Sequence, residues 1–67
     1  MAQIAVNGEE RELTGTIRLS ELLDSLALPL RLIAVEVNGN VIKRTEWETT
    51  EIGDGDRLEV VHFVGGG

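Results

Sequence analysis

The chain has 67 residues and a formal net charge of −6, from twelve acidic and six basic side chains. A chain of this length forms one small domain, which buries only about 60% of the surface that its unfolded state exposes. The sequence has no cysteine and one histidine, which excludes disulfides, zinc–thiolate sites and all-histidine metal sites. The fold must therefore rest on apolar packing and backbone hydrogen bonds.

The acidic charge also excludes classes of partner. Nucleic acids and anionic membrane surfaces both bind through clustered Lys and Arg, which an acidic chain lacks. No apolar run comes near the ~20 residues of a membrane span, and the first residues lack the pattern of a signal peptide. We expect a cytoplasmic protein that binds neither nucleic acid nor membrane. So short a chain rarely builds a deep catalytic cleft, which favours a carrier, adaptor or binding module over an enzyme.

In chain order, the first predicted unit is a hairpin. In residues 2–6, Ile4 and Val6 are two positions apart and so lie on one side, as in a half-buried strand. Asn7-Gly8 is a turn dipeptide, and residues 11–14 predict a weaker return strand.

A helix is predicted next, over residues 16–27, because the leucines there change to a helical spacing. Thr16 is the expected N-cap, and Leu28-Pro29 is expected to stop the helix. One helical stripe contains Leu19, Leu22, Leu23 and Leu26.

The second half of the chain predicts further strands and turns, with Asn38-Gly39 as the clearest turn. The expected strands are residues 33–37, 41–42, 49–52 and 57–63. One helix and a mixed four- to five-stranded sheet indicate an α+β domain of two layers. With the first and last strands parallel in the middle of the sheet, this is the β-grasp, or ubiquitin-like, roll.

Three features that could have a chemical role are interpreted as structural. Asp54 and Asp56 lie in a glycine-flanked turn without the spacing of a calcium loop, so no metal site is predicted. His62 has no visible partner that would make it a general base, and we expect it half-buried at a strand end. Trp47 is expected to cover one end of the core, although an interface role stays open.

The final glycines are different, since they contribute no packing and cost the most backbone entropy to order. We divide the chain into a domain, residues 1–64, and a flexible tail, residues 65–67. The tail is either a disordered end or a thin arm that threads a partner's channel with the carboxylate of Gly67 at its tip. Activation of that carboxylate as an acyl-adenylate would let a sulfur nucleophile convert it to a thiocarboxylate.

A docking surface is predicted beside the tail. If Leu58 and Val60 face the helix, Val61 and Phe63 lie on the open face of the sheet. An apolar patch there would bind a partner, unless a neighbouring loop covers it.

The sequence resembles the ThiS sulfur carriers of thiamine biosynthesis along nearly its whole length. The resemblance is strongest from residue 33 onward, in the Asn-Gly turn, in the Gly-Asp before the last strand and in the terminal glycines. The residues that carry it are Val35–Gly39, Val41, Ile42, Arg44, Trp47 and Gly55–Gly67.

The resemblance implies a protein co-substrate and not an enzyme. An E1-like adenylyltransferase, using its own ATP and magnesium, would admit Gly65 and Gly66 to its active site and adenylate Gly67. Sulfur would then replace AMP, and thiazole synthase would receive it. The expected partner-binding residues are Val61, Phe63 and Val64, the chain itself binds no cofactor, and the free carrier is expected to be a monomer.

Three alternatives stay open. The chain could carry sulfur for molybdopterin or tungsten cofactor assembly, or it could be a ubiquitin-like protein modifier joined to targets through Gly67. It could also be a plain interaction domain with an inert tail.

Overall fold

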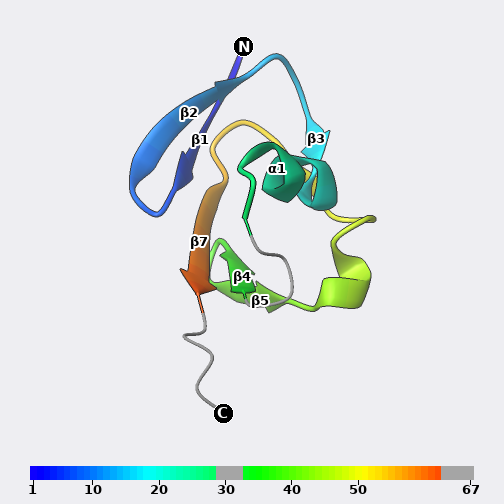
Figure 1. Cartoon of the computed structure of the whole chain (residues 1–67). Coiled ribbons are helices and arrows are strands. Elements are labelled where there is room, and N and C mark those ends of the chain that lie inside the picture. The colour runs from blue at the N-terminus through cyan, green and yellow to red at the C-terminus, as the bar shows by residue number, and fades with distance from the viewer. Residues whose placement is uncertain (29–32, 63–67) are drawn as a thin grey trace.

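The computed structural model describes residues 1–28 and 33–62, which form a curved sheet around one helix (Figure 1). The elements in chain order are β1 (Ala2–Val6), β2 (Glu9–Leu13), β3 (Ile17–Arg18), α1 (Leu19–Ser25), β4 (Ile33–Val37), β5 (Asn40–Ile42), the 3₁₀ turn η2 (Arg44–Glu46), β6 (Glu51–Ile52) and β7 (Arg57–His62).

The main sheet has five strands in the order β2-β1-β7-β4-β5. β1 and β7 are parallel neighbours, with Val6 opposite Leu58, and the other pairs are antiparallel. The predicted α+β roll, with the first and last strands adjacent and parallel, is confirmed. β7 therefore lies in the centre of the sheet.

The two Asn-Gly dipeptides form the predicted hairpin turns. Asn7 and Gly8 have φ of 51° and 85°, and Asn38 and Gly39 have 52° and 86°. Positive φ at both central residues is the geometry of the type I′ turn, which suits the twist of a hairpin and favours Asn followed by Gly.

The helix begins two residues later than a Thr16 cap requires, so that prediction is wrong. Ile17 and Arg18 are extended and pair with β6 in a separate two-stranded sheet. Arg18 is the N-cap residue, and its backbone N–H donates to Glu21 Oε1 at 3.3 Å. The N–H groups of Leu19 and Ser20 donate to the carbonyls of Thr50 and Trp47 at 2.8 and 3.0 Å, so the loop before β6 caps the helix.

The helix also ends earlier than predicted, at Ser25. Ala27 has φ of 56°, the left-handed conformation that commonly closes a helix, and its N–H donates to Asp24 O at 3.0 Å. Pro29, the predicted stop, is outside the described residues.

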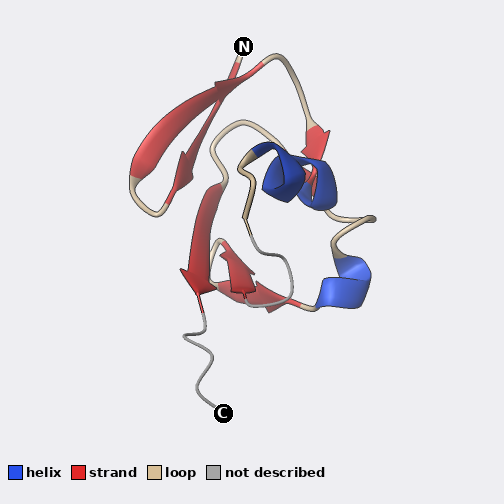
Figure 2. Cartoon of the chain, in the orientation of Figure 1, coloured by secondary structure: helices blue, strands red, loops and turns tan. Residues whose placement is uncertain are grey.

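The core lies between α1 and one face of the main sheet (Figure 2). The predicted helical stripe supplies three buried leucines, and Leu26 packs against the cluster at its edge. Trp47 is only 5% exposed, and its Nε1 donates to Ile42 O at 3.1 Å, which confirms its predicted place over the end of the core. The buried cluster is Ile4, Val6, Leu19, Leu22, Leu23, Ile33, Val35, Val37, Trp47, Ile52 and Leu58.

Candidate functional site

The last strand, β7, is the part of the described chain that precedes residues 63–67 in the sequence, so its two faces are the described surfaces nearest in sequence to the tail. Leu58 is 2% exposed and Val60 packs against the core, both on the helix side. Glu59 and Val61 point the other way, and Val61 is 49% exposed. The predicted alternation of β7 is confirmed, and Val61 lies on the open face. The remaining predicted site residues, Phe63, Val64, Gly65, Gly66 and Gly67, are outside the described residues.

The open face of the sheet next to Val61 combines apolar and acidic side chains. Ala34 of β4 lies opposite Val61, and Val41 of β5, opposite Glu36, is 68% exposed. We call Ala34, Val41 and Val61 the open-face patch. Two exposed valines on the same face, on the strands at either side of β4, are more typical of a contact surface than an isolated apolar surface residue is.

Two carboxylates border this patch and face each other across β4 and β7. Glu36 and Glu59 are direct partners in the strand register, so their side chains project side by side from the open face. Like charges in this arrangement destabilise a sheet. The acidic pair would be stabilised by a cationic side chain on a docked partner, in line with the charge of the whole chain.

His62, at the end of β7, is exposed, so the prediction that it is half-buried is wrong. The strand alternation puts it on the helix side, where it is nevertheless exposed. It borders a hollow that Val6, Leu26, Leu28 and Val60 also line.

The acidic turn before β7 is a structural turn, as predicted. Asp56 accepts hydrogen bonds from the Gly53 N–H at 2.8 Å and from Asn38 Nδ2 at 3.0 Å. Asp54 Oδ1 accepts from the Gln3 N–H at 2.7 Å, which ties the turn to β1. Within residues 1–28 and 33–62, no group of three His, Asp or Glu side chains could hold a metal ion.

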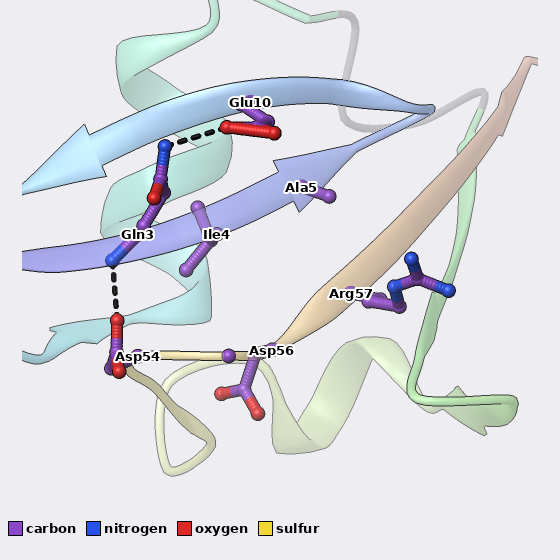
Figure 3. A pocket seen from close by; sticks show the side chains of 8 residues that line it. Gln3, Ile4, Ala5, Glu10, Asp54, Asp56 and Arg57 are labelled. Carbon is purple, nitrogen blue, oxygen red and sulfur yellow. Dashed lines mark hydrogen bonds between the residues drawn. The ribbon is translucent and has the colours of Figure 1, made fainter.

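A shallow cavity of about 300 Å³ lies between this turn and β1 (Figure 3). Gln3 crosses it, with its backbone N–H bonded to Asp54 and its Nε2 donating to Glu10 Oε1 at 2.6 Å. The carboxylates that line the cavity, those of Glu10, Asp54 and Asp56, thus already accept hydrogen bonds from the protein, which fits a structural role for the cavity.

The candidate site therefore consists of an exposed sheet face and the strand that precedes the glycine tail in the sequence. Comparison with known proteins assigns the family. The model of the ThiS family matches residues 4–67. The chain belongs to the ThiS family. The sulfur carrier protein ThiS of Bacillus subtilis (strain 168) is 37% identical over 67 residues, covering 96% of this chain and 98% of that protein. This ThiS-family chain is accordingly a sulfur carrier of thiamine biosynthesis.

The fold agrees with a solved ThiS structure. The crystal structure of the thiamine biosynthesis protein ThiS from Geobacter metallireducens matches with a TM-score of 0.85 and 34% sequence identity, covering 97% of this chain and 99% of that one. The β-grasp interpretation is thus confirmed by a relative as well as by the strand order.

A second kind of relative is much longer. The thiazole synthase of Paramagnetospirillum magneticum is 35% identical over 65 residues, which are 97% of this chain but 20% of that protein. The ThiS-family chain thus spans about a fifth of the length of this relative. Among the described residues, no helix has the length and apolar character needed to cross a membrane.

Sequence reasoning missed the roles of the two asparagines that precede the turn glycines. It used Asn7 and Asn38 as turn signals only, whereas both side chains bond to β7. An Asn side chain can imitate a peptide group, but only the strand register shows which groups it meets.

Proposed function

We propose that Gly67 is the sulfur-carrying residue and that its carboxylate is activated by an E1-like adenylyltransferase. The carboxylate oxygen attacks the α-phosphorus of ATP, pyrophosphate leaves, and an acyl-adenylate forms on Gly67. A persulfide sulfur then attacks the acyl carbon, and AMP leaves. Reduction of the remaining sulfur–sulfur bond by a thiol releases the thiocarboxylate. ATP and magnesium act in the activating enzyme, and the chain binds no cofactor.

The observation that carries this proposal is a family match that runs through the glycine tail to residue 67. The composition supports it, because the sequence has no cysteine that could carry sulfur or compete for the activated acyl group. Three residues without side chains, Gly65 to Gly67, fit a narrow channel in a partner.

We further propose that the thiocarboxylate is delivered to thiazole synthase, where its sulfur enters the thiazole ring and the carrier returns with a plain carboxylate. The similarity to a longer thiazole synthase supports this partner, because in that relative a domain like this one is part of the same chain. Val61, Phe63 and Val64 are proposed to contact the partners, with the exposure of Val61 in support.

Intact-mass spectrometry tests the function. The protein is incubated with an E1-like enzyme, ATP, magnesium and a persulfide donor with a thiol reductant. We expect a mass increase equal to the difference between sulfur and oxygen, located at Gly67 by fragmentation. Deletion of Gly67 is the control, which should abolish the increase while circular dichroism shows an intact fold. An unchanged mass in the full chain, or adducts of the chain on target lysines instead, would refute the carrier role.

A further inference from the structure

The two flanks of β7 are unequal near the tail. β4 pairs with β7 as far as His62, whereas β1 reaches only Leu58 in the strand register. β5 pairs with β4 at Val35–Val37, so it extends alongside this stretch only at Val35, the partner of Val60. Within the described residues, Val61 and His62 would therefore be one half of a two-stranded ribbon at this end of the sheet. Figure 1 shows β7 continuing past the tip of the β1–β2 hairpin.

The Asn7 side chain occupies the position where the next residue of β1 would lie. Its backbone N–H donates to Leu58 O at 2.9 Å, which is the last main-chain bond between the two strands that the structure shows. Its side-chain Oδ1 then accepts from the Val60 N–H at 2.7 Å, and its Nδ2 donates to Val60 O at 3.2 Å. A carboxamide presents one carbonyl and N–H donors, as a peptide group does, so Asn7 extends the ladder although the backbone has turned away.

Asn38 gives an internal comparison at the opposite end of β7. It has the same turn geometry as Asn7, its Oδ1 accepts from the Arg57 N–H at 2.9 Å, and its Nδ2 donates to Asp56 Oδ1 at 3.0 Å. One asparagine thus holds the first residue of β7, and the other holds Val60 in its second half. Only Asn7 lies beside the stretch that contains Val61 and leads into residues 63–67.

We infer that Asn7 is a positioning residue for the reaction at Gly67, an inference that rests on the proposed function. Two-stranded ribbons twist more strongly than strands within wider sheets. By holding both polar backbone groups of Val60, Asn7 limits the twist of the last three residues of β7. It thereby fixes Val61 within the open-face patch and sets the direction in which the chain leaves the sheet.

A small rotation at this point changes where the glycine tail starts. Phe63 and Val64 separate His62 from the glycines, and two residues reach at most about 7 Å. A rotation of roughly 10°, well within the range of strand twist, would shift the start of the tail by about 1 Å. A partner that must bind the sheet face and receive Gly67 together would detect that shift, because misplacement by about 1 Å can cost a reaction about 100-fold.

Asn7→Gly and Asn38→Gly form a matched pair of variants. Glycine accepts the left-handed φ of the turn, so each change removes a side-chain amide and keeps the turn. Each removes two hydrogen bonds, and both Tm values should fall by about 4–8 °C. Below both transitions, we expect kcat/KM for adenylation of Asn7→Gly to fall about tenfold, chiefly through KM, and that of Asn38→Gly to stay within about twofold. NMR should show faster exchange of the Val60 amide proton in Asn7→Gly alone.

Asn7→Asp is the second variant in case Asn7→Gly does not fold. It keeps the acceptor for the Val60 N–H and places a carboxylate oxygen against the Val60 carbonyl, so its KM should rise in the same direction. Equal KM values for the Asn7 and Asn38 variants would overturn the inference and leave Asn7 with a structural role. If the wild-type chain gains no sulfur, the proposed function itself fails, and that result is separate from any difference between variants.

Discussion

Leu58 and Val61 stand three residues apart on β7, and they show how differently the two faces of the sheet are used. Leu58 faces the helix and is 2% exposed, whereas Val61 faces outward and is 49% exposed. The helix side joins Leu58 to the buried cluster, and the outer side carries the open-face patch. The inner face thus stabilises the fold, and the side chains of the outer face are available to contact partners.

The acidic pair strengthens this contrast. Glu36 and Glu59 are opposed on the outer face, where their mutual repulsion opposes folding. Arg57 lines the same hollow as these two side chains and offsets part of that repulsion. The pair of carboxylates itself adds no stability to the sheet, in contrast with the inner face.

Leu58→Ala should give the largest effect and tests whether the inner face carries the stability. Truncation of a fully buried leucine costs about 2–5 kcal/mol, a large part of the stability of so small a domain. Urea unfolding followed by circular dichroism measures the loss. The matched change Val61→Ala, on the same strand, should alter the free energy of unfolding by no more than about 0.5 kcal/mol. Similar losses from the two variants would break the comparison.

Val61→Asp tests whether the outer face binds the activating enzyme. A charge in the centre of an apolar contact should weaken binding by about 1–2 kcal/mol, roughly tenfold in Kd, since few interface residues dominate affinity. The exposed side chain predicts a nearly unchanged Tm, and calorimetric titration measures the Kd. Phe63→Asp, next to the tail, is expected to behave alike. A large loss of stability in that variant would instead place Phe63 in the core.

Glu59→Gln should give the smallest effect, and it sharpens the comparison by separating stability from binding. Removing one of two opposed carboxylates should stabilise the domain by about 0.2–1 kcal/mol. The same change should weaken docking to a basic partner surface, and added salt should reduce the difference from wild type. Thermal melts and titrations at two salt concentrations measure both effects. Stronger binding by Glu59→Gln would contradict a cationic partner group.

Much of the fold could be predicted because its signals are local. The leucine spacing of the helix, the alternation of β7 and the two Asn-Gly turns each depend on a few neighbouring residues. The parallel contact of β1 with β7 entered the prediction only as a condition of the β-grasp roll, because periodicity gives the elements and not their pairing order.

The errors arose where distant segments decide the structure. Thr16 is a good capping residue by type, but Ile17 and Arg18 pair with β6, more than thirty residues away, and the helix starts after them. A strand of two residues has no periodicity to detect. The exposure of His62 depends on what packs against that end of β7, which strand alternation alone does not give. The role of Asn7 required the register of β1 against β7.

The left-handed Ala27 also bears on how hard the domain is to unfold. A residue with a Cβ is disfavoured in this conformation, and glycine is the usual choice after the last turn of a helix. Natural proteins rarely have the highest stability that their fold allows. Here the Cβ atom of Ala27 lowers the stability, and its removal would raise it. Ala27→Gly should raise the melting temperature, which would provide a hardier scaffold for loading unnatural acyl groups onto the glycine arm.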